Sequence, residues 1–486
     1  MQFKYMKTRI LSIILVCIIL LGGSAKADNV DLQTAKQIGA YYFSVATGAK
    51  APVNSDNLKL AQQYDNSTLC IPAMYAFNVE GNGFVVVSAS DAVEPILAYS
   101  PEGNLDPETL NPAAKYMLDS YAKIIRDVQN SKAEANTSVS SLWQELREQT
   151  FTCDLSKAGV LIQTKWDQGE NNSPTYNAMC PVIDGKYCYA GCVAVAMGQI
   201  IKYWNYPERG GNESSSTVTC SWNNTTVKYK FLVDSNKFVY DSMPNTLSTN
   251  SQWNYKRAIG KLLFACGVAV GMDWGVEGSG AQSSSVPTAL SKWFKYSDNA
   301  RYLSRTSITD ANWIKLLRSE IVDNLRPVYY SGYDATGAGR DAGHAWVIAG
   351  ASATDENKYY INWGWGGSAN GFYTLAPISS IQTAGGYTFN DGHAMVYQIY
   401  PKDLSIDENA IVATTPAYPN PANGYIMIPV GLPNSAAMGV YSIDGKMVDN
   451  IVIPAGTQEY RLDLRHYTPG TYIYRLNGQT FKFTVL

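Results

Sequence analysis

The sequence predicts an α+β protein built from three consecutive units, and three observations lead to this fold class. An apolar helix is expected over residues 192–204, and two alternating strands are expected over residues 344–350 and 358–363. After residue 401, short strand-like segments separated by turn residues indicate a small β-sandwich. A chain of 486 residues with 46% hydrophobic residues is long enough for about three domains of ~100–200 residues each.

The first 27 residues have the features of a signal peptide. Three basic residues precede an apolar run over residues 10–21, and Ala25 and Ala27 form an Ala-x-Ala cleavage site. This run is too short to span a membrane, and no later run reaches about 18 apolar residues. We therefore expect residues 1–27 to be removed and the remaining chain to be exported without a membrane span.

Residues 28–155 form a separate predicted unit of mixed helix and strand. After a helical segment, a Gly-Asn-Gly turn inside residues 74–88 indicates a β-hairpin, and apolar spacing over residues 117–128 indicates an amphipathic helix. The polar stretches at residues 130–141 and 147–157 are expected cleavage regions, because exposed small and polar residues favour nicking.

Cys192 stands at the head of the central apolar helix, a position that favours a reactive thiol. The thiolate is the nucleophilic form, and the unpaired N–H groups at a helix N-terminus lower a cysteine pKa. Gly191, Ala194 and Gly198 keep the first turns thin, so that another segment can pack close to the sulfur. The helix is expected to end at residues 205–207, because a proline disfavours the helical conformation in the residue before it.

A nucleophilic thiol needs a base, and the chain contains three histidines, His344, His393 and His466. His344 opens a strand that is followed by a second one, and in such a hairpin we expect Asn362 or Trp363 beside the imidazole. His393 has a similar local setting without the second strand, and His466 lies in the C-terminal unit. The expected base is therefore His344, with His393 as its rival.

Three separated motifs, at residues 191–207, 343–348 and 362–367, resemble those of streptopain-type cysteine proteases. These are secreted bacterial enzymes with a papain-like fold. The local signature that surrounds the cysteine of papain is absent, so the resemblance is to the streptopain branch. It implies a papain-like catalytic domain, which we place at residues 156–400, and a cysteine endopeptidase activity.

The resemblance also implies roles for single residues. Cys192 would attack the peptide carbonyl, and His344 would exchange the proton with the thiol and the leaving amine. Gln168 matches the glutamine whose side-chain amide, with the backbone N–H of Cys192, forms the oxyanion hole. Asn362 and Trp363 occupy the Asn-Trp position near the histidine and are expected to orient it. From the residues alone, Gln168 is a polar residue in a loop.

Further segments match other parts of this family. Ser283 and Ser284 match a loop that borders the substrate groove, although a serine-rich surface loop explains them equally well. The glycine-rich residues 384–392 match a mobile flap. Residues 83–88 and 94–100 resemble the streptopain propeptide. This last resemblance implies that the N-terminal unit inhibits the enzyme by covering the active site until it is cleaved away.

The C-terminal unit, residues 401–486 with its linker, resembles the sorting domains of the Bacteroidetes type IX secretion system. The resemblance rests on the Tyr-Pro-Asn-Pro string at residues 418–421, a Gly-Thr-Tyr strand and the Lys-Phe-Thr-Val-Leu terminus. It implies a domain that binds the secretion machinery, carries the protein across the outer membrane and is then removed or used for surface attachment. A carbohydrate-binding or protein-binding sandwich is the alternative from the residues alone.

Composition limits the partners. A net charge of −3 with 16% charged residues is too balanced to indicate nucleic acid or an anionic membrane as a partner. The expected partners are protein or peptide substrates and the chain's own propeptide, and no cofactor is expected.

Eight cysteines, minus Cys17 in the signal peptide, leave seven, and an odd number in an exported protein indicates an unpaired thiol. Cys180 with Cys188 and Cys220 with Cys266 are possible pairs, although the pattern of disulfides cannot be deduced from sequence. A zinc site at Cys180, Cys188 and Cys192 lacks both the Cys-x-x-Cys spacing and a fourth ligand, so no metal is expected.

Two other classes of function stay open at this stage. A different Cys–His acyl transferase, such as an amidase or a transglutaminase, shares the same nucleophile chemistry. An inactive surface adhesin on the same fold is the alternative without catalysis.

Overall fold

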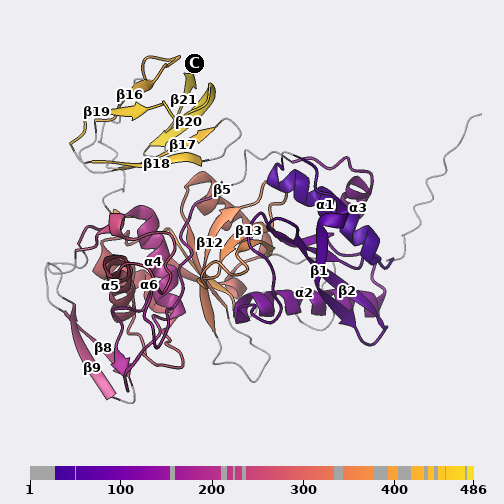
Figure 1. The fold of residues 1–486 in the computed structure, drawn as a ribbon, viewed down its shortest axis with the longest axis horizontal. Helices are drawn as coiled ribbons and strands as arrows, with labels where there is room; N and C mark the ends of the chain where they lie inside the picture. Colours follow the sequence, from indigo (N-terminus) through magenta and orange to yellow (C-terminus); the bar gives the residue numbers. More distant parts are fainter. Residues whose placement is uncertain are drawn as a thin grey trace, which may run out of the picture.

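The computed structural model describes residues 28–49, 51–153, 159–209, 216–222, 225–231, 237–332, 343–375, 392–402, 417–431, 436–442, 447–454, 456–476 and 479–486. Figure 1 shows an N-terminal unit, a central unit and a smaller all-β unit at the C-terminus. The mixed helix and sheet content agrees with the predicted α+β class. The expected signal peptide, residues 1–27, lies outside the described residues.

The N-terminal unit is an antiparallel meander covered by helices, and it contains the helix, the hairpin and the amphipathic helix that the sequence predicted. The expected hairpin is present, with Met74 paired to Ser88 and Asn78 to Phe84. The amphipathic helix is also present, and it buries Met117, Tyr121 and other apolar residues along one side. The elements are α1 (Leu32–Thr47), β1 (Leu58–Asn66), β2 (Ile71–Val79), β3 (Phe84–Ser88), β4 (Ile96–Ser100), α2 (Pro112–Ser131) and α3 (Thr137–Arg147).

The central unit packs helices against both faces of an antiparallel sheet, and each face has its own apolar core. Its helices are α4 (Cys192–Trp204), α5 (Trp253–Ala269), α6 (Val286–Phe294) and α7 (Asp310–Arg318). Its sheet strands are β5 (Gly159–Val160), β10 (Arg301–Ser304), β11 (Val328–Gly332), β12 (His344–Ala351), β13 (Lys358–Asn362), β14 (Gly371–Thr374) and β15 (Ala394–Tyr397). The hairpins β6 (Val182–Ile183) with β7 (Lys186–Tyr187), and β8 (Ser216–Trp222) with β9 (Thr225–Phe231), stand apart from this sheet.

The predicted cysteine-headed helix is confirmed as α4, which ends at Asn205 in the left-handed conformation. The thin turns predicted for α4 admit β12 beside the sulfur, where the Ala345 N–H hydrogen bonds to it, and a neighbouring helix two turns further along. A Cβ added at Gly198 lies 2.4 Å from Cδ2 of Leu263 on α5, so glycine permits this close helix contact.

One sheet runs through the N-terminal and central units, in the order β1-β2-β3-β4-β14-β13-β12-β11-β15-β10. The junction is the antiparallel pair β4–β14, in which Tyr99 faces Phe372 and Ala98 faces Tyr373. The N-terminal unit is therefore attached along the β14 edge of the central sheet. Sequence alone gave no indication of this pairing.

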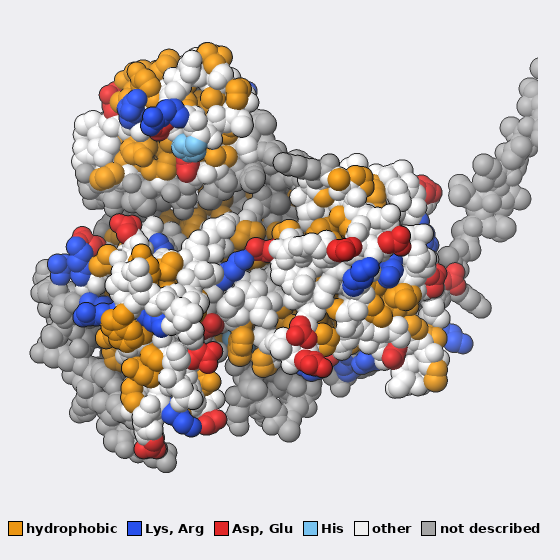
Figure 2. Space-filling model, viewed as in Figure 1, with side chains coloured by type: hydrophobic (Ala, Val, Ile, Leu, Met, Phe, Trp, Pro, Cys, Tyr) orange, Lys and Arg blue, Asp and Glu red, His pale blue; other side chains and the backbone are white. Residues whose placement is uncertain are grey.

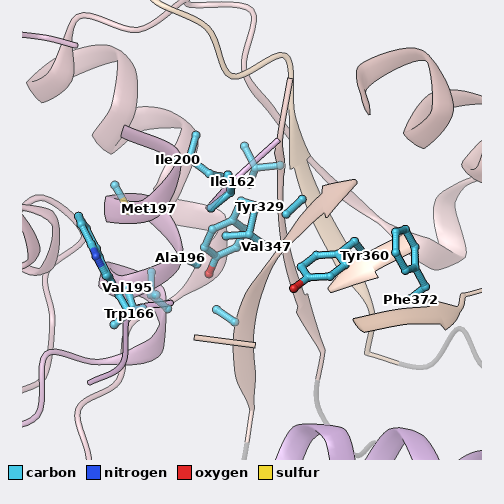
Figure 3. Packing of buried hydrophobic residues seen from close by; sticks show 14 of the residues in the cluster. Ile162, Trp166, Val195, Ala196, Met197, Ile200, Tyr329, Val347, Tyr360 and Phe372 are labelled. Carbon is cyan, nitrogen blue, oxygen red and sulfur yellow. The ribbon is translucent and has the colours of Figure 1, made fainter. Parts of the chain in front are cut away.

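One core of the central unit lies between α4 and the sheet, and a second core, which includes Trp313 of α7, lies on the opposite face. Figure 3 shows Val195, Ala196 and Ile200 of α4 facing Tyr329 and Val347 of the sheet. Burying such an aliphatic side chain contributes about 1.5–3 kcal/mol, so this contact fixes the helix that carries Cys192 against the strands that carry His344.

The C-terminal unit has two antiparallel sheets, β16-β19 and β18-β17-β20-β21, around their own apolar core, which confirms the predicted β-sandwich. The strands expected from the sequence at residues 425–430, 439–443, 459–464, 472–476 and 480–485 each overlap an observed strand. The described residues also include β18, which was missed because its apolar residues are interrupted by Asp449 and Asn450. The strands are β16 (Tyr425–Pro429), β17 (Ala436–Ser442), β18 (Met447–Ile453), β19 (Glu459–Asp463), β20 (Gly470–Leu476) and β21 (Gln479–Val485).

Charged side chains of both signs are scattered over the face shown in Figure 2, without a large patch of one sign among the described residues. This pattern agrees with the balanced composition. In the described part of the chain, no helix has both the length and the apolar character needed to cross a bilayer.

Candidate active site

A cavity of about 1250 Å³ opens in the central unit, and both Cys192 and His344 line it. Gln168, Ser283 and Ser284 line the same cavity. The structure thus brings five of the seven predicted site residues to one place, although they come from distant parts of the sequence. The other two, Asn362 and Trp363, are buried beside the cavity rather than exposed in it.

Gly191 sets the position of Cys192 at the start of α4. Its φ of +85° is unfavourable for residues with a Cβ, and an added Cβ lies 2.6 Å from Cε of Met272. The Gly191 carbonyl accepts the first helical hydrogen bond, from the Val195 N–H at 3.0 Å. Glycine at this position therefore lets the chain turn sharply into the helix with Cys192 as its first residue.

The environment of the Cys192 sulfur differs from the sequence-based expectation. Burial raises the pKa of the thiol, although backbone N–H groups of Ala345, Val193 and Cys192 itself hydrogen bond to the sulfur and favour the thiolate. The helix N-terminus acts in the predicted direction, but the loss of solvent outweighs it. The prediction of a lowered pKa is wrong for this structure.

His344 is the first residue of β12, and its ring is held in one orientation. Nε2 lies 2.7 Å from the backbone carbonyl oxygen of Trp363. A carbonyl oxygen only accepts hydrogen bonds, so Nε2 carries the proton and Nδ1 of the neutral ring has a free lone pair. Burial lowers the pKa of His344 to about 4, with the Trp363 hydrogen bond opposing the shift, so the ring is neutral at pH 7.

Trp363 therefore contacts the histidine through its main chain. Its indole is fully buried and donates to the Ala369 carbonyl at 2.9 Å. A different indole, that of Trp365, packs against the imidazole with ring centroids 5.1 Å apart. Trp365 also lines the cavity, and the sequence analysis did not single it out.

Asn362 lies in a buried amide network rather than against the imidazole. Its Nδ2 donates to the Thr164 carbonyl at 2.6 Å and to Oε1 of Gln199 at 3.1 Å. Its Oδ1 accepts from the Gly364 N–H at 3.1 Å. Because Gln199 belongs to α4, this network ties the helix of Cys192 to the turn that presents the Trp363 carbonyl.

Gln199 was not predicted as a site residue. It is fully buried in an otherwise apolar helix, and its Oε1 also accepts from the Thr164 hydroxyl at 2.8 Å. A lone amide inside an apolar helix was the available signal, because a buried polar group needs hydrogen-bond partners.

Gln168 and the serines reach the cavity from separate loops. The Gln168 carbonyl accepts from the Ala190 N–H at 2.8 Å, which brings the Gln168 loop beside the turn before Cys192. Ser283 begins a short 3-10 helix, Ser283–Ser285, and its hydroxyl lies 2.7 Å from the hydroxyl of the buried Tyr329. Ser284 lies in the same turn.

His393, the rival base, is buried and does not line the cavity, although its neighbours Gly332 and Gly392 do. Its Nδ1 lies 3.1 Å from the Tyr330 hydroxyl, and burial, with a contribution from Arg305, lowers the pKa of His393 to about 4. His466 is half exposed in the C-terminal unit, with Nε2 3.0 Å from Oδ2 of Asp449. The predicted flap falls almost entirely on residues 376–391, which lie outside the described residues.

The described cysteines carry no disulfide, and the possible Cys180–Cys188 pair is not formed. Cys266 is also free, and the side chain of Cys220 lies outside the described residues. No cluster of metal-ligating side chains occurs in the described part of the chain.

The described residues of the N-terminal unit do not line the cavity, whose described walls come from residues 167–392. This differs from the cover over the active site that the resemblance implied. The unit lies instead along β14, and its Glu102 forms a 2.9 Å ion pair with Lys165, three residues before Gln168.

Comparison with known families assigns all three units. Residues 166–373 match the Peptidase C10 family, residues 27–125 match the Spi protease inhibitor family, and residues 416–485 match the secretion system C-terminal sorting domain.

Individual relatives agree with this assignment. The chain is 29% identical over 422 residues to streptopain of Streptococcus pyogenes, covering 82% of this chain and 100% of streptopain. It is 26% identical over 477 residues to the thiol protease/hemagglutinin PrtT of Porphyromonas gingivalis, covering 92% of this chain and 50% of PrtT. A solved fragment of Prevotella intermedia prointerpain A is similar in fold, with a TM-score of 0.54, 25% identity, and coverage of 71% of this chain and 98% of the fragment.

Proposed function

We propose that Cys192 is the nucleophile and His344 the base of a cysteine peptidase that is exported as a zymogen. The chain carries a peptidase C10 domain between an inhibitor-type propeptide and a secretion sorting domain. One observation carries the assignment. The imidazole donates from Nε2 to the Trp363 carbonyl, which leaves the Nδ1 lone pair available to take a proton.

The reaction follows from these atoms. Nδ1 of His344 takes the thiol proton as the Cys192 sulfur attacks the carbonyl carbon of the peptide bond. The resulting imidazolium then gives this proton to the leaving amine, and an acyl-enzyme remains. A water molecule, deprotonated by the same ring, hydrolyses the thioester and restores the thiol.

Gln168 supplies the second donor for the negative oxygen that forms during attack, beside the backbone N–H of Cys192. Removing one such donor typically costs about 2.7–4 kcal/mol, or 10²–10³-fold in kcat. The position of Gln168 on the cavity wall, with its carbonyl bonded to the Ala190 N–H, supports this role.

The remaining predicted residues act indirectly. Trp363 orients the imidazole through its carbonyl, and Asn362 holds the turn that presents this carbonyl. Ser283 and Ser284 form one wall of the groove that receives the peptide.

In this structure, burial raises the pKa of Cys192 and lowers that of His344, so the neutral thiol and imidazole are favoured over the ion pair. We infer that proton transfer accompanies substrate attack and does not precede it in this form of the protein.

The proposed maturation uses four segments: a signal peptide at residues 1–27, the propeptide at 28–155, the catalytic domain at 156–400, and the sorting unit with its linker at 401–486. Of the expected cleavage regions, residues 130–141 include the end of α2 and the start of α3, which is fastened by the buried Trp143. The second region, residues 147–157, is therefore the better candidate for the cut. The proposed destination is the cell surface or the medium, reached through the secretion machinery.

The test is Cys192→Ala in the full chain, with His344→Gln as a second variant. Both variants should lose hydrolysis of a denatured protein substrate, measured as new peptide termini, and both should fail to mature. Retained hydrolysis in His344→Gln would refute the assignment of the base. Loss of hydrolysis with normal maturation would show that another protease matures the chain.

A further inference from the structure

Gln168 and Cys192 must point at one oxygen atom, yet residues 169–191 separate them in sequence. A loop of this length does not fix the distance between its ends, so contacts inside it must do so. Asn177 lies within this loop and is fully buried.

The side-chain amide of Asn177 joins the two ends of the loop. Its Nδ2 donates to the carbonyl of Glu170, two residues after Gln168, and to the carbonyl of Cys188, four residues before Cys192, both at 3.1 Å. Its Oδ1 accepts from the Glu170 N–H at 3.2 Å.

A fourth hydrogen bond uses the remaining hydrogen-bonding capacity of the side-chain amide. The Thr175 N–H also donates to Oδ1, at 3.2 Å. Two donors and two lone pairs are the whole hydrogen-bonding capacity of an asparagine side chain, so Asn177 has none left for a substrate.

The packing against the Gln168 loop is equally close. Gly169 has a φ of +90°, and a Cβ added there lies 2.1 Å from Oδ1 of Asn177. Only glycine permits both this backbone conformation and this approach. The Asn177 amide therefore lies directly against the residue that follows Gln168.

We propose that Asn177 is a positioning residue, which holds Gln168 in register with the turn that leads into Cys192 and so aligns the two oxyanion donors. The proposal rests on the oxyanion role of Gln168 proposed above. Asn177 itself touches neither the substrate nor the reacting atoms.

The distinguishing variant is Asn177→Asp, which keeps the size of the side chain and removes both N–H donors. At pH 8 the carboxylate faces the Glu170 and Cys188 carbonyls, so the Gln168 loop shifts and kcat falls about 10- to 100-fold with KM little changed. At pH 5 a protonated carboxyl donates to one of these carbonyls again, and the kcat ratio of variant to wild type rises. Asn324→Asp makes the same chemical change at a helix end remote from the cavity and should leave the pH profile unaltered.

A second measurement distinguishes this proposal from the oxyanion role of Gln168, on which it rests. In a Gln168→Ala background, Asn177→Asp should change kcat less than about 3-fold, because the donor it positions is already absent. If the two losses multiply, or if Asn177→Asp raises KM and leaves kcat unchanged, Asn177 does not act through Gln168. If Gln168→Ala alone leaves kcat unaltered, the oxyanion assignment fails instead.

If Asn177→Asp does not yield folded protein, Asn177→Ser serves in the same cycle. Serine keeps one donor and leaves room for water to bond the carbonyl that is released. It should lower kcat less than the aspartate does, without the recovery at pH 5. An unchanged kcat in Asn177→Ser also overturns the proposal.

Discussion

Replacing Lys358 with methionine should destabilise the zymogen at the interface between propeptide and catalytic domain. Lys358 lies on β13 with its side chain only 2% exposed, and its Nζ is 2.5 Å from Oδ2 of Asp355 and 3.4 Å from Oε2 of Glu94. Glu94 belongs to the propeptide and Asp355 to the catalytic domain, so one buried charge joins the two units. Methionine keeps an unbranched apolar side chain and removes this charge.

The expected loss of unfolding free energy is large, because two carboxylates lose the lysine that they share. Removing one member of a buried ion pair typically costs about 3–5 kcal/mol. Burial raises the pKa of Glu94 to about 7 even with Lys358 present, so without the lysine this carboxyl takes up a proton. Burial acts on Asp355 in the same direction, but the charge and hydrogen bond of Lys358, together with the Asn357 N–H, outweigh it and hold the pKa of Asp355 below its usual value. Asp355 therefore carries most of the uncompensated charge in the variant.

Glu94 also predicts how stability depends on pH. Its pKa in the folded zymogen, about 7, lies above the ordinary value of 4.5. The stability that depends on this proton is fully present below pH 4.5 and is lost as the pH rises through 7. The variant Glu94→Gln should remove this dependence while Lys358 stays paired with Asp355.

The assay is urea unfolding of the full chain carrying Cys192→Ala, which is expected to prevent self-processing. Lys165→Met is the matched control, since Lys165 also pairs with a propeptide glutamate, Glu102, at 2.9 Å, but with side chains 35% and 44% exposed. An exposed pair of this kind contributes about 0–1 kcal/mol. If Lys358→Met lowers the free energy of unfolding no more than Lys165→Met does, burial of the lysine does not stabilise the contact between the two units.

Three further outcomes are expected. The first concerns the rate at which Cys192 is alkylated in the freshly prepared zymogen, measured in a Cys70→Ser background that removes the exposed thiol. This rate should keep rising up to and beyond pH 9, because burial raises the pKa of the Cys192 thiol. A rate that reaches a plateau below pH 7 would contradict this. Gly191→Ala should lower kcat/KM at least about 10-fold through backbone strain of about 1–2 kcal/mol and the shift of the helix start, whereas an unchanged value would show that the turn tolerates a Cβ. Tyr329→Phe, which removes the hydroxyl partner of Ser283, should lower kcat/KM about 5-fold through KM; a change confined to kcat would place Tyr329 elsewhere in the mechanism.

Much of the candidate site could be predicted because local sequence carries its signals. A cysteine before an apolar run and a histidine at the start of a strand are both visible in short windows, and both residues line the cavity. Among the three histidines, the second strand behind His344 favoured it over His393 as the expected base, and His344 is the one that lines the cavity.

Residues that act through buried hydrogen bonds were not predictable in this way. Asn177 has no distinctive neighbours in sequence. Gln199 stands out as a lone amide in an apolar helix, but its partners Thr164 and Asn362 lie in distant segments. The direction of the Cys192 pKa shift could not be predicted from the sequence either, because every segment that packs around the sulfur contributes to its burial.

The order of the three units, the position of the cysteine at a helix head and the strand pair behind His344 follow from the sequence by itself, because hydrophobic period and turn residues act over a few residues. Tertiary structure alone decided that the propeptide extends the catalytic sheet through β4 and β14, and that the ring of His344 donates to the main chain of Trp363. The strand pairing joins backbone groups on both sides, and the acceptor for the His344 ring is a backbone carbonyl. Every residue possesses these groups, so the identity of the residues did not predict either contact.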